Sequence, residues 1–250
     1  MSRYEAYMDS TSLSSLDSSI RVLDIQPADV SPSIRTVRIA NIPGALVTNK
    51  MVEKSSVTIF FEIHKYSTSD RIAVCQKVHK WAKGTFLTTS DRSGQRLHAV
   101  CESYPNPNAK GWTEPLSITF SGYAPPFWEE TTAVTKTILG SGTESLVIPG
   151  TEEAFVSAAV TVTGSATSMT FTVDGKSIVL SGLTTVANDV IALGYNNQIL
   201  YVNRNNTSIR DKVTASSADV LKVQCGGTSS LHFESDGTCS CAYSIRGCWL

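Results

Sequence analysis

The chain has 250 residues, of which 41% are hydrophobic and only 17% charged, and its 21 Lys and Arg residues nearly balance its 22 Asp and Glu residues. This balance of charge excludes a protein that binds nucleic acid through a broad basic surface, because such binding depends on many Lys and Arg contacts to phosphate. Serine and threonine make up about a quarter of the chain, which favours turn-rich β structure over a helical bundle.

The first half of the chain contains runs that alternate between apolar and polar residues, which is the pattern of half-buried strands. The clearest run is Val57, Ile59, Phe61 and Ile63, which alternate with Thr58, Phe60, Glu62 and His64. On this basis we expect strands at residues 20–25, 34–40, 57–64, 95–104 and 116–120.

One helix is predicted among these strands. Asp70 is expected to cap its start and Gly84 to follow its end, because these residue types favour such positions. Between them, Ile72, Cys75 and Val78 recur at helical spacing on one face. We therefore expect that face to pack on the first sheet.

A break falls at residues 124–128 (Ala-Pro-Pro-Phe-Trp), where two prolines interrupt a strand-like run. The charge changes sign there: residues 1–128 have a net charge of +3 and residues 129–250 a net charge of −4. The sequence therefore predicts two domains, 1–128 and 129–250, each of ordinary size.

The second half consists of short predicted strands separated by turns, which is typical of a β-sandwich. Asp174-Gly175 predicts a tight hairpin, since this dipeptide accepts positive φ angles. Asp236-Gly237 predicts a second hairpin that leads into a long last strand, residues 238–250. An alternative is that this last strand packs outside the second domain. Along that strand we expect one face to be shared by Cys239, Cys241, Tyr243, Ile245 and Trp249.

No motif with a catalytic mechanism is found. Gly175-Lys176-Ser177 lacks the earlier glycine of a phosphate-binding loop, because Thr170 stands there, and a strand follows it. No Gly-x-Ser-x-Gly motif is present. His64, His79, His98 and His232 sit in predicted strands or on the helix. We expect no enzymatic activity and no cofactor.

Cys225, Cys239, Cys241 and Cys248 are the best candidate for a metal site, since four thiolates can bind zinc. Strand alternation turns Cys248 away from Cys239 and Cys241, so we favour buried, reduced thiols and expect no metal. A small ligand site is considered at Tyr195 and Tyr201, which flank polar residues, although a plain hairpin explains them better.

The chain has no apolar stretch of membrane-spanning length, and its first 19 residues are polar. We therefore expect that the protein is made in the cytoplasm and does not insert into a membrane.

In their order and spacing, these features resemble the distal tail (Dit) proteins of long-tailed, non-contractile bacteriophages and prophages. The resemblance is carried in the first domain by residues 14–25, the helix ending at Trp81-Ala82-Lys83-Gly84, the turn at 91–95 and Pro126-Phe127-Trp128. In the second domain it is carried by residues 150–164, 180–183, 216–219 and 246–250.

This resemblance implies a mainly β protein with a ring-forming (belt) domain that contains one α-helix, followed by a galectin-like β-sandwich. It implies a homo-hexameric ring at the phage tail tip, or baseplate, that joins the tail tube protein to a trimeric tail-associated hub protein. The channel would pass DNA and the tape-measure protein, and receptor-binding proteins are further partners. Such a protein is made in the host bacterial cytoplasm and resides in the virion. The alternative is a carbohydrate- or receptor-binding sandwich of the adsorption apparatus.

Overall fold

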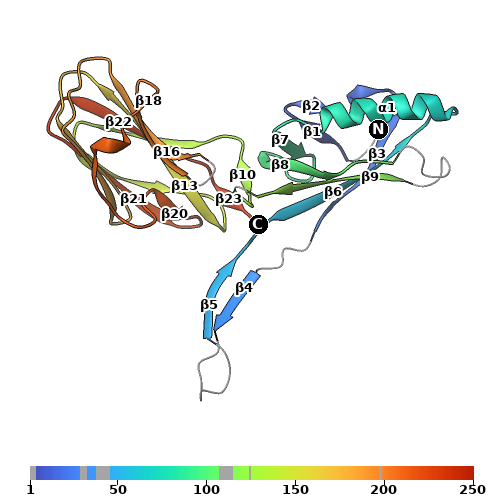
Figure 1. Ribbon diagram of the computed structural model, residues 1–250, viewed down its shortest axis with the longest axis horizontal. Helices are drawn as coiled ribbons and strands as arrows, with labels where there is room; N and C mark the ends of the chain where they lie inside the picture. The colour runs from blue at the N-terminus through green and yellow to red at the C-terminus, as the bar shows by residue number, and fades with distance from the viewer. Residues whose placement is uncertain (1–3, 29–32, 38–45, 107–114, 124, 197–198) are drawn as a thin grey trace. The chain divides into compact units, whose positions relative to one another are not determined.

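A computed structural model describes residues 4–28, 33–37, 46–106, 115–123, 125–196 and 199–250 of the chain (Figure 1). Its contacts divide the chain into two compact units: Met1–Trp128 with Leu250, and Glu129–Trp249. Both are built mainly from antiparallel strands, and the described residues contain one α-helix. The predicted mainly β fold class is confirmed.

The first unit is organised around one sheet with the strand order β2-β1-β7-β8-β9-β6-β3. A short 3-10 helix, η1 (Ser14–Leu16), follows β2. The strands of the sheet are β1 (Ala6–Met8), β2 (Thr11–Ser12), β3 (Ile20–Pro27), β6 (Ser55–Ile63), β7 (Phe86–Thr89), β8 (Gln95–Ser103) and β9 (Leu116–Gly122).

Strand β6 shows why this sheet forms. Its residues alternate between buried and half-buried from one end to the other, and Val57, Ile59, Phe61 and Ile63 form the buried set. Successive side chains of a strand point to opposite faces, so one face of β6 joins the core while the other stays half-buried. The predicted strand 57–64 is confirmed, with a start two residues earlier.

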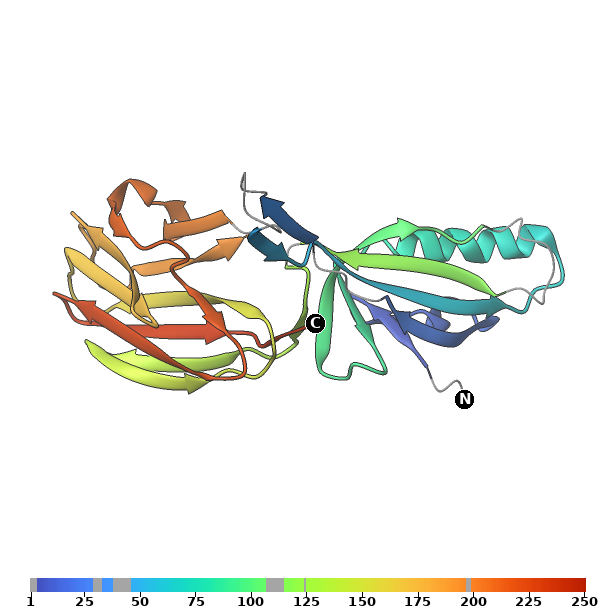
Figure 2. The ribbon, with the colours of Figure 1, turned by 90° about the horizontal axis from the view of Figure 1, so that it is seen from below.

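Helix α1 (Thr68–Trp81) covers the buried face of the sheet (Figure 2). Its N-cap is Ser67, whose hydroxyl accepts the Asp70 backbone N–H at 3.1 Å, so the predicted cap at Asp70 is wrong by one turn. Asp70 instead lies in the first turn, where its charge favours the helix dipole. Val74 and Val78 are buried toward the sheet.

Gly84 follows the helix for a reason other than the predicted one. Its φ angle is not positive, so it is no left-handed cap. A Cβ at this position would lie 2.3 Å from Met8 Cγ and 2.6 Å from Asp9 Oδ2. Close packing of the helix exit against the turn after β1 is what requires glycine here.

Two further strands, β4 (Ser33–Val37) and β5 (Leu46–Met51), form a ladder of their own. Within the described residues this ladder, which we call the arm, pairs with no other sheet, and it projects from the first unit in Figure 1. The strand predicted at 34–40 is found as β4, and its last three residues lie outside the described part.

The second unit is a sandwich of two sheets. One sheet has the order β11-β22-β13-β16-β17-β18, with β20 joined to β13, and the other has the order β12-β21-β14-β15-β19. Their bounds are β11 (Val134–Leu139), β12 (Gly142–Val147), β13 (Glu153–Val162), β14 (Ser168–Val173), β15 (Lys176–Ser181), β16 (Val190–Asn196), β17 (Ile199–Arg204), β18 (Thr207–Ser208), β19 (Val213–Ser216), β20 (Lys222–Gln224), β21 (Thr228–Ser235) and β22 (Cys239–Ile245). A 3-10 helix, η2 (Arg210–Lys212), precedes β19.

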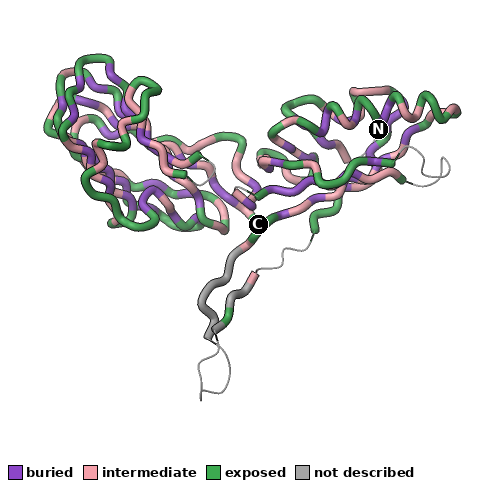
Figure 3. Tube along the Cα trace, in the orientation of Figure 1, coloured by how far each residue is buried: buried purple, intermediate pink, exposed green. Residues whose placement is uncertain are grey.

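The sandwich core lies between these sheets, where buried residues line their inner faces (Figure 3). The Phe171 and Phe233 rings contact each other at a tilt of 50°, with their centroids 5.2 Å apart. Tyr243 is fully buried, and its hydroxyl donates to the His232 carbonyl of the opposite sheet at 2.7 Å. This bond satisfies a polar atom that would otherwise be costly to bury.

The two predicted hairpins have different outcomes. Asp174 and Gly175, with φ angles of 49° and 78°, join the paired strands β14 and β15, as predicted. The hairpin predicted at Asp236-Gly237 is wrong, because β21 and β22 belong to different sheets. A turn dipeptide marks a chain reversal, but it does not decide whether the flanking strands pair with each other.

The predicted last strand, 238–250, is also interrupted. β22 ends at Ile245, and a separate strand, β23 (Cys248–Trp249), pairs with β10 (Trp128–Glu130). Trp249 therefore does not share a face with Cys239, and its indole N–H donates to Glu130 Oε1 at 3.1 Å.

Candidate functional site

The outer face of the first sheet, which α1 does not cover, is lined by hydroxyl groups on neighbouring strands. Thr58 and Thr119 lie opposite each other with their hydroxyl oxygens 3.1 Å apart. One step along the same ladder, the Ser56 and Ser121 hydroxyl oxygens are 2.6 Å apart. We call these four residues the hydroxyl ladder. Ser121 is fully buried and the other three residues are half-buried, so the ladder is a partly covered polar seam without a net charge of its own.

Acidic side chains at the two ends of this ladder have cationic neighbours. Lys54 Nζ lies 2.7 Å from Glu102 Oε1, and this ammonium lowers the pKa of the Glu102 carboxyl below its ordinary value. At the other end, Glu62 Oε1 lies 3.8 Å from Arg21 and 3.2 Å from the His64 ring. Each of these acids is therefore balanced by a neighbouring cation, Lys54 for Glu102 and Arg21 for Glu62.

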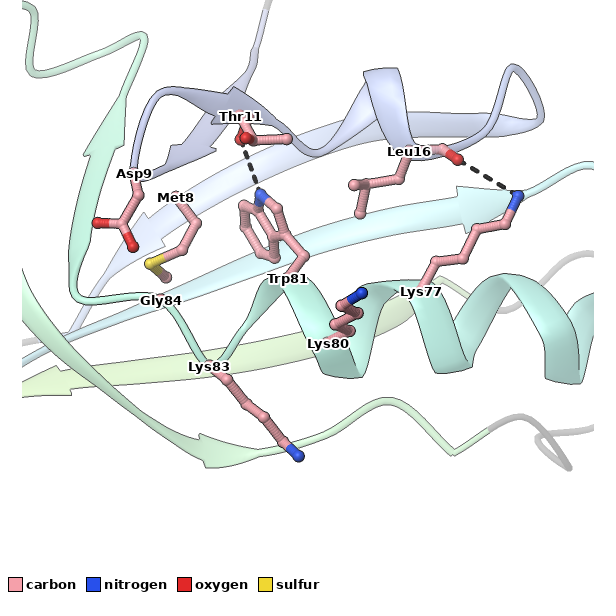
Figure 4. Close-up of a pocket in the computed structure, with 9 residues that line it drawn as sticks. All are labelled: Met8, Asp9, Thr11, Leu16, Lys77, Lys80, Trp81, Lys83 and Gly84. Carbon is pink, nitrogen blue, oxygen red and sulfur yellow. Dashed lines mark hydrogen bonds between the residues drawn. The ribbon is translucent and has the colours of Figure 1, made fainter.

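A groove of about 540 Å³ lies on the other side of the unit, between α1 and the segment that contains β1, β2 and η1 (Figure 4). Trp81 spans it, and its indole N–H donates to the Thr11 carbonyl at 2.7 Å. Lys77 reaches Asp17 across the groove at 2.9 Å. Its remaining lining residues are Met8, Asp9, Leu16, Lys80, Lys83 and Gly84.

The groove is not arranged for proton transfer. The Asp9 carboxylate already accepts the backbone N–H groups of Thr85 and Phe86, at 2.8 and 2.9 Å. Hydrogen bonding by Lys77 holds the pKa of Asp17 well below its usual range. Both acids therefore act as structural acceptors, and the groove offers an apolar floor with lysines along one side.

The candidate ligand residues Tyr195 and Tyr201 are placed on opposite faces of their sheet. Tyr201 pairs with Gly194, the neighbour of Tyr195, and successive side chains of a strand alternate between faces. The Tyr195 hydroxyl donates to the Val220 carbonyl at 2.7 Å. The structure therefore does not bring the two rings into one patch, and the polar residues 197–198 between them lie outside the described part.

The four cysteines considered as metal ligands fall into two separate pairs. Cys239 and Cys241 lie on the inner face of β22, and burial raises the pKa of the Cys241 thiol to about 12. Cys225 and Cys248 form a separate pair, with the Cys248 N–H 3.4 Å from Cys225 Sγ. All four are buried and free of disulfides.

Sequence reasoning did not single out the hydroxyl ladder or the arm. The signal for the ladder was partly present, because Thr58 and Glu62 lie between the apolar positions of the 57–64 run, although Phe60 does so too. What the alternation could not show is which strands lie beside β6 and which face the helix covers.

The fold matches solved phage proteins over the whole chain. The Dit protein of phage SPP1, described as a paradigm of the hub adsorption apparatus in phages that infect Gram-positive bacteria, has a TM-score of 0.74 at 11% identity, covering 97% of this chain and 98% of that one. A chain of the phage p2 baseplate in its activated conformation with calcium has a TM-score of 0.52 at 11% identity, covering 98% and 97%. Its strontium form gives 0.51 at 11% identity, covering 97% of each chain.

No protein-family model matches the sequence, and no curated protein matches it. The chain nevertheless has the fold of the phage Dit proteins in both units, so the resemblance noted in the sequence is confirmed at the level of fold. No helix in the described part of the chain is long and apolar enough to cross a membrane.

Proposed function

We propose that this protein is a structural component of a phage tail tip, where six copies form a ring between the tail tube and the tail-associated hub. The observation that carries the proposal is the likeness to the Dit protein of phage SPP1 over 97% of the chain. A match that includes both units and their order supports the same kind of assembly more strongly than either unit alone would.

Closing a ring requires a heterologous contact, in which one surface of each subunit meets a different surface of the next. The arm formed by β4 and β5 is suited to this, because within the described residues it pairs with no other sheet of its own chain. It connects β3 to β6, which already pair at Pro27 and Val57. The fold of the first unit therefore does not depend on the arm, which is free to contact a neighbour.

We assign the channel lining to the face that carries the hydroxyl ladder. The half-buried Thr58 and Thr119 hydroxyl groups hydrate the wall, and the paired charges of Glu102 with Lys54 and Glu62 with Arg21 leave little net charge to hold DNA. DNA affinity rises with the number of unbalanced cations that meet phosphates. Such a wall lets DNA and the tape-measure protein pass without binding them.

The remaining partners follow from this position in the virion. The ring would contact the tail tube protein on one side and a trimeric hub protein on the other, with receptor-binding proteins attached around it. It would be made in the host bacterial cytoplasm and would act without a catalytic step, a cofactor or membrane insertion.

The ring is tested by native mass spectrometry and negative-stain electron microscopy of the purified full chain. We expect hexamers, or pairs of stacked hexamers, at micromolar concentration. Replacing residues 30–53 by an Asn-Gly turn should keep the cooperative thermal unfolding of the remaining chain and abolish the ring. A matched change in the same unit, replacing residues 107–114 by a short Gly-Ser linker, should leave the ring intact. A wild-type monomer at high concentration would overturn the proposal.

The channel assignment is tested with one added charge per subunit. Thr119→Lys places six cations on the proposed wall, so its rings should retain duplex DNA in a salt-dependent manner that wild-type rings do not show. Gln76→Lys adds the same charge on the exposed side of α1 and serves as the control. Equal DNA retention by the two variants would count against this wall.

A further inference from the structure

Two of the six free cysteines meet inside the second unit. Cys225 directly follows β20, and Cys248 begins β23, 23 positions later in the chain. The backbone N–H of Cys248 donates to Cys225 Sγ at 3.4 Å, and the two residues are only 3% and 6% exposed.

The backbone around Gly150 holds this pair in place. Gly150 has a φ of +122°, and a Cβ there would lie 2.4 Å from the Cys248 oxygen and 2.9 Å from Cys225 Cβ. The Cys248 carbonyl accepts the Thr151 N–H at 2.9 Å, while Cys225 N–H donates to the Glu152 carbonyl at 3.0 Å. One short segment thus fixes both cysteines, one on each side of it.

The pair is within reach of a covalent bond. A sulfur 3.4 Å from the partner's amide nitrogen leaves the two Cα atoms at most about 7.7 Å apart, so a small shift of β23 suffices to reach the range of a disulfide. We propose that Cys225 and Cys248 form a disulfide when the protein meets an oxidising medium. This timing rests on the proposed function, because a virion component leaves the reducing cytoplasm when the host lyses.

The other cysteines are less suited to pairing. Cys75 and Cys101 belong to the first unit. Cys239 and Cys241 are two residues apart on β22, and both pair with β13, at Val162 and Val160. Parallel side chains at this spacing on a strand cannot meet without distorting the ladder.

The reaction is a thiol–disulfide exchange with a small-molecule disulfide such as oxidised glutathione. The thiolate of one cysteine attacks this reagent, forms a mixed disulfide and releases one glutathione thiolate. The second cysteine, also as thiolate, attacks the protein sulfur of the mixed disulfide and displaces the second glutathione. The protein loses two protons and two electrons, and the reagent is reduced to two thiols.

Burial sets the rate of this reaction. It raises the pKa of the Cys225 thiol, and it raises that of Cys248 to about 12. Because the thiolate is the reactive form, oxidation requires local opening of the short strand β23. We therefore expect a slow reaction that is faster at alkaline pH.

The bond would close a loop that contains β21 and β22, which restricts the unfolded chain. For a loop of this length we expect the thermal midpoint of the second unit to rise by about 10 to 15 °C. A tail tip that persists outside the cell would gain stability only after assembly is complete.

The test is oxidation of the folded full chain with oxidised glutathione at mildly alkaline pH, followed by unfolding in denaturant, alkylation of the free thiols with N-ethylmaleimide and peptide mapping. We expect four alkylated cysteines and one linked peptide pair that contains Cys225 and Cys248. Cys225→Ser and Cys248→Ser should each abolish the bond and the rise in thermal midpoint. Cys239→Ser is the matched buried control and should keep both.

Six alkylated cysteines after prolonged oxidation, or a linkage between any other pair, would overturn the proposal. The result does not depend on assembly. A monomer that forms the bond would contradict only the proposed ring. A ring in which all six thiols of each chain stay free would contradict only the disulfide.

Discussion

Removing the Trp81 side chain tests how α1 is held on the first unit. The indole is 7% exposed, contacts the Phe120 ring edge-on at a centroid distance of 5.8 Å, and donates its N–H to the Thr11 carbonyl at 2.7 Å. Replacing a buried aromatic residue by alanine costs about 3–5 kcal/mol. Because the groove lets solvent reach one edge of the ring, we expect Trp81→Ala to cost about 3 kcal/mol.

The contribution of the hydrogen bond is separated by Trp81→Phe, which keeps an aromatic ring and loses the N–H donor. This variant should cost about 1 kcal/mol, since the Thr11 carbonyl then faces the groove and can bind water. Urea unfolding gives the free energies, and hydrogen exchange of the α1 amides shows whether the loss is local to the helix. Equal costs for the two variants would refute the argument that ring burial holds the helix.

Two further predictions concern the same unit. Because Lys77 holds the pKa of Asp17 well below its usual range, the ionised form is favoured by folding; its stabilisation is complete above the ordinary pKa of about 4 and is lost as pH falls. Asp17→Asn should therefore flatten the dependence of the denaturation midpoint on pH in that acid range, and an unchanged profile would contradict this. Gly84→Ala forces a methyl group to 2.3 Å from Met8 Cγ and should cost about 1–3 kcal/mol in thermal unfolding. Gly175→Ala, at a φ of +78° with open space around it, should cost about 1 kcal/mol, and the reverse order would refute the crowding argument.

Local patterns predicted most of the elements, because they depend on residues that are near in sequence. The alternation in residues 57–64 identified β6, and helical spacing through Cys75 and Val78 identified α1. The cap at Ser67 was missed because Ser67 and Asp70 are both good capping residues one turn apart. Strands β11 and β12 were missed because their residues are largely exposed, so they carry little hydrophobic signal.

The candidate sites were less predictable, since they depend on which strands become neighbours. Tyr195 and Tyr201 are close in sequence, yet the register of β16 and β17 turns them to opposite faces. Cys225 and Cys248 are far apart in sequence, yet the segment around Gly150 brings them together. Side-chain type alone gave no indication of either outcome.

By itself, the sequence determined a near-neutral, serine- and threonine-rich chain of short strands with one helix and a break near its middle, because composition and periodicity are local properties. Tertiary structure alone decided that β21 and β22 enter different sheets, that the hydroxyl ladder lies on the face away from α1, and that the arm pairs with no other described strand. These features depend on backbone pairing between distant segments, and a strand carries the same alternation whichever neighbour it finds.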